Sequence, residues 1–342
     1  MKKKSQKVIL ISRNPNIRLK GNQLGIDTEL FKDEIFPKPC DQYKGIVEVF
    51  MPGSSLEKMF TDERGVPVEE VYQYENFDWI ENEFVEIVSD TSKAIGRYTN
   101  GRIVRLKYDK SIPGGHKALN VEQVVFWESL LMPPDIAPLV VTKGVAGTGK
   151  TYCSLAMALN AIEKKGDKKK QTYKQIIVAT PTVTVANEEL GFLPGEIDDK
   201  VGPYLGGIVD NLKEILRPKF PDFTNAELKK KAMEFFERGD IEIQPIGFLR
   251  GRTIPNTVFI IDETQNIKPC DIKDIVTRSA EGSKFIFLGD ADQVNNPALN
   301  SRYNGLVYLS EKMKGNPHTF QITLNSKKSV RSKLAQEALD IL

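Results

Sequence analysis

A glycine-rich loop between two apolar stretches constrains this chain more than any other feature of its sequence. Residues Leu139–Ile162 read LVVTKGVAGTGKTYCSLAMALNAI: a β-branched run, a loop, and a run with helical apolar spacing. Residues Gly144–Thr151 match the pattern G-x-x-x-x-G-K-[ST] at every position. Glycines let backbone N–H groups turn inward around phosphates, and the N-terminus of the next helix adds a favourable dipole. A strand, a loop and a helix in this order predict a phosphate-binding loop.

The parts of this loop have separate expected partners on a nucleoside triphosphate. Lys150 is expected to reach the β- and γ-phosphates, and the Thr151 hydroxyl to bind Mg²⁺. ATP and Mg²⁺ are therefore the expected cofactors. The residues predicted to contact the nucleotide here are Gly144, Val145, Ala146, Gly147, Thr148, Gly149, Lys150, Thr151 and Tyr152.

Two later apolar runs end in polar residues. Val258–Ile261 is entirely apolar, as in a central parallel strand buried on both faces, and it ends in Asp262 and Glu263. Acidic residues at the carboxyl end of such a strand lie beside the phosphate loop. We expect Asp262 to hold Mg²⁺ through water and Glu263 to polarise the attacking water as a general base.

The second of these runs, Phe285–Leu288, is followed by Gly289, Asp290 and Gln293. An uncharged amide near the γ-phosphate can sense whether that phosphate is present. We therefore expect Gln293, which follows the third such strand of the same sheet, to lie at the γ-phosphate.

The pattern of apolar residues and turns divides the chain into three zones. Residues 111–342 alternate buried-type strands with amphipathic helices, which predicts an α/β fold with a parallel sheet. Residues 45–110 consist of short apolar pieces separated by turns, which predicts a small, mostly β module. Within it we expect one helix near Ser54–Phe60 and a hairpin turn at Thr99–Gly101. Residues 1–44 hold a predicted strand, Val8–Ser12, and a predicted helix near residues 16–24.

Composition excludes several classes of protein. The chain has 342 residues, with 48 Lys and Arg against 46 Asp and Glu, so its net charge of +2 argues neither for nor against nucleic acid. Its three cysteines are too scattered for a disulfide framework or a zinc site, and two histidines are too few for a His-based cluster. The apolar run Val8–Ile11 is too short for a signal peptide or a membrane span. We expect a cytoplasmic protein without a membrane partner.

The order of the motifs resembles that of the PhoH family, single-core relatives of superfamily 1 helicases. The resemblance covers residues 111–342 and implies one RecA-like P-loop core that hydrolyses ATP. It further implies RNA or single-stranded DNA as the partner, and RNA helicase as the specific activity. Besides the phosphate loop, the segments that carry it are LGFLPGEIDDKVGPYL at Leu190–Leu205, FLRGRT at Phe248–Thr253, FIIDETQN at Phe259–Asn266, FLGDADQ at Phe287–Gln293 and VRSKLAQEAL at Val330–Leu339.

The resemblance also assigns a role to a residue upstream of the loop, and it shows one departure. Gln123 matches the family's upstream glutamine, which implies adenine recognition through its paired donor and acceptor. The family usually reads Thr-Arg-Pro after the second strand, but this chain has Ala179, Thr180 and Pro181. The role of that arginine is therefore absent or supplied from elsewhere.

The N-terminal segment Val8–Ile26 resembles the last strand and helix of a PIN nuclease domain. Asn14 stands where that family usually has an aspartate, and a neutral amide is a poor ligand for Mg²⁺ or Mn²⁺. We interpret residues 1–44 as an incomplete PIN-like segment, either a remnant or part of a truncated chain. An unrelated αβ cap is the alternative.

The resemblance has a consequence for assembly. Superfamily 1 helicases carry two cores, and the second core supplies an arginine across the cleft; residues 111–342 have room for one. We therefore expect a homo-oligomer, a hexameric ring, in which a neighbouring copy supplies the arginine. Arg331 is the first candidate, and Arg250 and Arg252 are the second candidates.

Two other functions use the same loop: a small-molecule kinase and a nucleotide switch with little turnover. Glu263 beside Asp262 favours water as the phosphate acceptor, which argues against both of these functions. The aromatic cluster of the β module has two interpretations, an OB-like surface for a nucleic-acid strand or simple core packing. Its members are Tyr72, Tyr74, Phe77 and Trp79.

Overall fold

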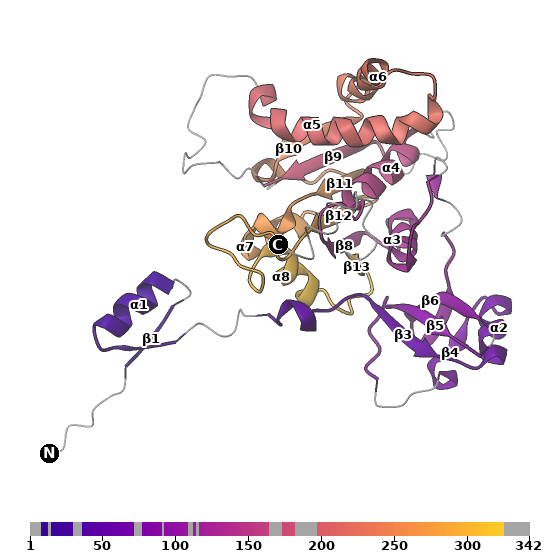
Figure 1. Ribbon diagram of the computed structural model, residues 1–342, viewed down its shortest axis with the longest axis horizontal. Helices are drawn as coiled ribbons and strands as arrows, with labels where there is room; N and C mark the ends of the chain where they lie inside the picture. The colour runs from indigo at the N-terminus through magenta and orange to yellow at the C-terminus, as the bar shows by residue number, and fades with distance from the viewer. Residues whose placement is uncertain are drawn as a thin grey trace.

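The structure is a computed structural model in which a helix-covered sheet, a small β module and a separate N-terminal unit can be distinguished (Figure 1). Several sequence features of interest lie outside the residues that it describes: Asn14, Tyr72, Tyr74, Arg250, Arg331 and residues 190–196. The described residues are 8–12, 15–29, 36–71, 77–90, 92–108, 112–113, 116–163, 173–181, 197–249 and 251–324.

The larger sheet has six strands in the order β10-β9-β11-β12-β8-β13, and every neighbouring pair is parallel. One strand, β12, separates β8, which leads into the phosphate loop, from β11, which leads into Asp262. This is the strand order of a RecA-like P-loop core, so the predicted α/β fold class is confirmed. The strands are β8 Leu139–Gly144, β9 Gln175–Thr180, β10 Ile241–Pro245, β11 Thr257–Ile261, β12 Lys284–Gly289 and β13 Thr319–Leu324.

Helices cover both faces of this sheet (Figure 1). Alternate residues of one strand enter different apolar clusters: Val140 packs with the helices of one face, and Leu139 and Val141 pack with those of the other. Burial on both faces explains why these strands are continuous apolar runs. The first face carries α3 Val121–Leu131, α4 Lys150–Glu163, α5 Ile197–Leu216 and α6 Asn225–Glu237, and the second carries α7 Pro269–Val276 and α8 Gly305–Lys312.

The β module is a five-stranded sheet in the order β3-β5-β6-β7-β4 with helix α2, Gly53–Thr61, packed on it. The expected helix and the expected hairpin turn are both present. Asn100 and Gly101 connect β6 to β7 with φ angles of 49° and 74°, and both values suit a tight hairpin turn. The strands are β3 Ile46–Phe50, β4 Val66–Pro67, β5 Phe84–Val88, β6 Lys93–Thr99 and β7 Arg102–Arg105.

The module is joined to the edge strand of the larger sheet. The side-chain amide of Asn82 donates to the Pro317 carbonyl at 2.8 Å, and Arg97 donates to the Asn82 amide oxygen. The Arg97 guanidinium also lies over the Phe320 ring of β13, 5.4 Å from its centroid. These contacts hold the module against β13, the edge strand of the larger sheet.

The N-terminal unit is a β-α-β arrangement of β1 Ile9–Ile11, α1 Pro15–Gln23 and β2 Asp27–Glu29. The strand and helix lie where the sequence predicts them, and β2, which pairs with β1 in parallel, was not expected. Across the described residues, none of the helices combines the length and the apolar character that a membrane crossing requires.

Candidate nucleotide-binding site

The phosphate loop connects β8 to α4, and its glycines are required by geometry. A Cβ at Gly144 would lie 2.8 Å from the Leu324 carbonyl oxygen of the neighbouring strand β13. Gly149 has a φ of +87°, which a residue with a side chain adopts only with strain. The loop can therefore pass close to β13 and turn into α4 only with glycine at these positions.

The lysine of the loop lies across its concave side. Lys150 begins α4, and its Nζ donates to the carbonyl oxygens of Gly144 at 2.5 Å and Val145 at 2.9 Å. The Thr148 hydroxyl donates to the same Val145 carbonyl at 2.9 Å. The ammonium group is thus held at the centre of the loop, where phosphate oxygens are expected.

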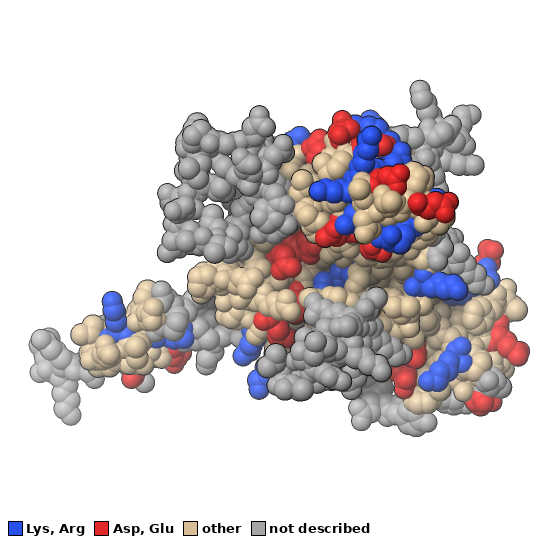
Figure 2. All heavy atoms as spheres, turned by 45° about the horizontal axis from the view of Figure 1, so that its top comes forward, with Lys and Arg blue, Asp and Glu red and all other residues tan. Residues whose placement is uncertain are grey.

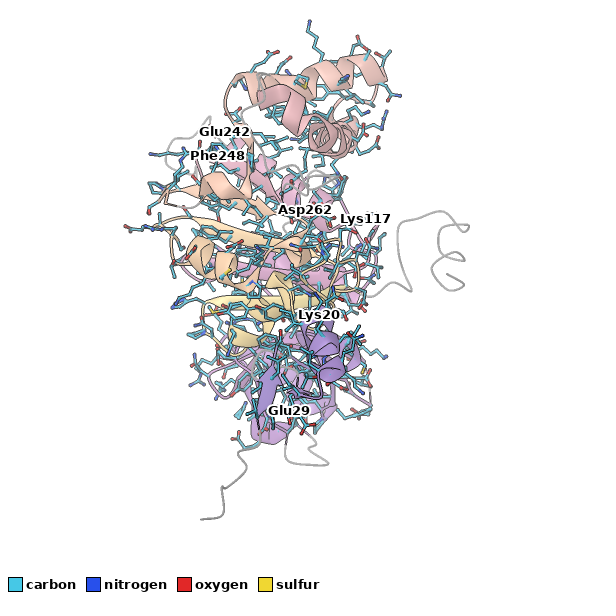
Figure 3. All side chains as sticks on the ribbon, turned by 90° about the vertical axis from the view of Figure 1, so that its left-hand side faces the viewer. Lys20, Glu29, Lys117, Glu242, Phe248 and Asp262 are labelled. Atoms are coloured by element: carbon cyan, nitrogen blue, oxygen red, sulfur yellow. The ribbon has the colours of Figure 1, made fainter. Side chains whose placement is uncertain are left out.

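A hydrogen bond connects the loop to the end of β11. The Thr151 hydroxyl donates to Oδ2 of Asp262 at 2.7 Å, and Oδ1 of Asp262 accepts from the backbone N–H of Glu263 at 2.9 Å. Among the described residues, no group of three or more His, Cys, Asp or Glu side chains could hold a metal ion by itself. A hydroxyl and one carboxylate nevertheless suit Mg²⁺, which usually completes its coordination with water and substrate phosphates. Asp262 lies in the α/β core below the α5–α6 helix pair (Figure 3).

Glu263 follows Asp262 in an unusual backbone conformation. Its φ of 53° and ψ of 35° are left-handed, which is uncommon for a residue other than glycine and typical of functional sites. Burial raises the pKa of its carboxyl group, and the negative charge of Asp262 raises it further. A hydrogen bond from Gln265 and the positive charge of Lys150 oppose this rise. A carboxylate with a raised pKa is suited to accept a proton from water.

Gln265 holds Glu263 in place, and sequence reasoning missed it. Its side chain is fully buried, and its Nε2 donates to Oε2 of Glu263 at 2.6 Å and to the Gln293 carbonyl at 3.1 Å. Its Oε1 accepts from the backbone N–H of Asp290 at 3.1 Å. The sequence does contain a signal for this role: Gln265 is an amide two residues after Glu263, and an amide can donate and accept hydrogen bonds at the same time.

Lys150, Thr151, Asp262 and Glu263 line a cavity of about 240 Å³. It combines the phosphate loop with the ends of β11 and β12, including the predicted Gln293. Asn211 of α5 also lines it and was not predicted. Figure 2 shows acidic and basic side chains at a hollow below the helix pair. The lining residues are Ala146, Gly147, Gly149, Lys150, Thr151, Tyr152, Asn211, Asp262, Glu263, Gly289, Asp290 and Gln293.

Gln123 lies behind the loop and does not line this cavity. It is buried near the start of α3, where its Nε2 donates to the Thr148 carbonyl at 3.1 Å and its Oε1 accepts from the Leu119 N–H at 2.9 Å. These bonds support the phosphate loop from α3. A primary amide has one further N–H and one further lone pair, so adenine recognition by Gln123 stays a prediction.

The remaining candidates lie away from the cavity. Arg252 is exposed and donates to the Gln244 side chain at 3.2 Å beside β10. Trp79 stacks on Tyr98 with the ring centroids 5.1 Å apart and packs against the core of the β module, which favours the core interpretation for this residue. Phe77 remains partly exposed at the edge of this pair.

Comparison with known proteins places this site in a family. Protein PhoH2 of Bacillus subtilis is 34% identical over 346 residues, which span all of this chain and 74% of that protein. Protein PhoH2 of Thermobispora bispora is 28% identical, across 98% of this chain and 70% of that protein. The solved structure of Pif1 helicase from Candida albicans aligns with a TM-score of 0.33 at 18% identity, over 66% of this chain and 43% of the other. A family model described as PhoH-like protein matches residues 117–342. The chain therefore belongs to the PhoH family.

Proposed function

We propose that this protein is a Mg²⁺-dependent ATPase that uses hydrolysis to act on a nucleic-acid strand, most specifically as an RNA helicase-like motor. The observation that carries the proposal is the chain of hydrogen bonds from Thr151 through Asp262 and Glu263 to Gln265. It joins a phosphate loop, a metal-binding pair and a carboxylate base within one cavity. Membership of the PhoH family supports the same reading.

Each residue has a distinct task in this proposal. Lys150 binds the β- and γ-phosphate oxygens, and Thr151 and Asp262 hold Mg²⁺, which neutralises charge on the phosphates. Glu263 accepts a proton from the water that attacks the γ-phosphate. Gln265 orients the Glu263 carboxylate, and Gln293 lies where it can respond to loss of the γ-phosphate.

The cavity lacks one group that such hydrolysis uses. Among the described residues, Lys150 is the cation that lines it, and no arginine does. An arginine finger stabilises charge in the transition state and contributes about 10³–10⁵ in rate. We propose that a neighbouring copy supplies it within a ring, with Arg331 as the first candidate. Of the second candidates, Arg250 and Arg252, the structure describes Arg252, whose exposed position leaves it accessible to a neighbour.

Stimulation of phosphate release by nucleic acid tests the proposed function. The assay measures ATP turnover by the full chain with and without single-stranded RNA, single-stranded DNA and duplexes. We expect single-stranded RNA to raise the rate several-fold. A rate that responds only to a small hydroxyl acceptor would identify a kinase, and ATP binding without turnover under every condition would identify a nucleotide switch.

A further inference from the structure

A second cavity, of about 700 Å³, lies where the β module meets helix α3, on the module side of the core. Among the described residues, three cations line it, Lys93 of β6, Arg105 at the end of β7 and Lys107 just after that strand, against one carboxylate, Glu63. We call this cavity the module groove. It is separate from the nucleotide cavity, and the two have no lining residue in common within the described ranges.

The cations of the module groove are exposed and available to a ligand. Within the described part of the chain, Lys93 and Lys107 make no side-chain ion pair. One guanidinium nitrogen of Arg105 donates to the Phe60 carbonyl at 3.1 Å, and its other N–H groups can reach a ligand. Positive side chains without a carboxylate partner favour an anionic occupant.

Apolar side chains lie between these charges. Ile95 and Leu106 form part of the groove wall and pack on the core, and Phe60, at the end of α2, is 49% exposed beside them. Free phosphate or a duplex backbone would use the cations and leave this surface uncovered. A single strand offers both a charged backbone and the open faces of its bases, which stack on aromatic rings.

We infer that the module groove binds single-stranded nucleic acid, with its phosphates on Lys93, Arg105 and Lys107 and a base against Phe60. The inference deepens the proposed function, on which it rests, by locating the strand on the chain.

The module groove also touches the support of the phosphate loop. Val124 of α3 lines it, and the adjacent Gln123 bonds to the Thr148 carbonyl. Farther along α3, the buried carboxylate of Glu128 accepts from the backbone N–H groups of Lys107 at 2.9 Å and Tyr108 at 2.7 Å. A strand in the groove therefore contacts a helix that is bonded to both the groove wall and the phosphate loop, which gives a physical route by which nucleic acid can change turnover.

A matched pair of double variants tests the inference by fluorescence anisotropy with labelled oligo(U) and oligo(dT) at several salt concentrations. Lys93→Ala/Lys107→Ala removes two charges from the groove. The control, Lys58→Ala/Arg64→Ala, removes two charges from the same module at exposed ion pairs outside the groove, where little stability is lost. We expect the groove variant to bind about tenfold more weakly and its log–log salt slope to fall by about 1.4, as two lost contacts to a single strand require.

The aromatic contact has its own signature. Phe60→Ala should weaken binding by about 5- to 150-fold, the range of one lost stacked base, while the salt slope stays unchanged. Thermal unfolding of every variant within a few degrees of the parent would show that the fold is intact. Poly-glutamate serves as a probe for a general polyanion site, and equal competition by poly-glutamate would overturn the inference.

Crosslinking of the parent chain gives a test without any substitution. An oligonucleotide with 4-thiouridine at each position in turn should crosslink to peptides that contain Phe60, Lys93 or Lys107. If the parent binds oligonucleotide but the groove double variant matches its control and the crosslinks map elsewhere, the groove assignment is overturned and the proposed function stands. If the parent hydrolyses ATP but binds neither RNA nor DNA, the nucleic-acid part of the proposed function fails, and the groove assignment fails with it.

Discussion

The side-chain amide of Gln265 donates to the carboxylate of Glu263 at 2.6 Å, and the same amide bonds to the backbone of Asp290 and of Gln293. One buried side chain thus fixes Glu263, the proposed base at the end of β11, relative to the end of β12. In the proposed mechanism, a change at the γ-phosphate that moves Gln293 is transmitted through Gln265 to the orientation of Glu263.

This relationship predicts a positioning role for Gln265. Gln265→Met keeps the volume and removes the amide, so kcat for ATP hydrolysis should fall about ten- to a hundredfold while KM changes little. The hydrogen bond from Gln265 lowers the pKa of Glu263, so its loss should raise that pKa and move the acid limb of the pH–kcat profile to higher pH. Gln244→Met, at the edge of the sheet, is the control. An unshifted profile for Gln265→Met would contradict the positioning role.

A second prediction concerns stability at the junction of the module and the core. Glu83 is buried, its Oε2 has no hydrogen-bond partner among the described residues, and burial raises its pKa to about 7. Because the folded protein holds the Glu83 proton more tightly than the unfolded chain does, protonated Glu83 contributes stability that is fully present below the unfolded pKa of about 4.5. This contribution is lost as the pH rises through 7. Glu83→Gln should therefore gain about 2–3 kcal/mol relative to the parent between pH 5 and pH 8.

Urea unfolding of both proteins at several pH values measures this difference. Glu69→Gln, at an exposed position in the same module, should show no such trend. A constant difference between Glu83→Gln and the parent across this range would show that Glu83 titrates normally in the folded protein.

Features of the fold and of the site could be predicted where a short stretch of sequence determines them. The phosphate loop, Asp262, Glu263 and Gln293 follow from short motifs at the ends of apolar runs, and the structure brings them to one cavity. The hairpin at Asn100 was predictable for the same reason, since a tight hairpin turn requires positive φ angles and Asn-Gly is the pair that tolerates them best.

The missed features depend on contacts between distant parts of the chain. Gln265 bonds to groups 25 and 28 residues away, and Asn82 bonds to a carbonyl 235 residues away. Asn211 lies on α5 beyond the end of the family segment Leu190–Leu205, and only the packing of α5 on α4 brings it to the nucleotide cavity. No periodicity in the sequence encodes such pairs.

The proposed ring makes a prediction about mixtures of inactive chains. Lys150→Ala removes the loop cation and Arg331→Ala removes the candidate finger, so each protein alone should lose most of its ATP turnover. In a mixture, some interfaces pair an intact loop with an intact finger, and part of the activity should return. Turnover per chain should also rise steeply with concentration and follow ring formation in light scattering. A fully active monomer, or no rescue in the mixture, would exclude an arginine donated between subunits.

The substitution Glu263→Gln tests the site most directly, because it removes the base while keeping the size of the side chain. ATP binding, measured by equilibrium titration with Mg²⁺, should remain within a few-fold of the parent. Single-turnover hydrolysis should fall by about 10²–10⁴, the contribution of a general base. Retained binding with this loss of hydrolysis is the expected result, and hydrolysis by Glu263→Gln at near the parent rate would contradict the assignment of the base and of the site built around it.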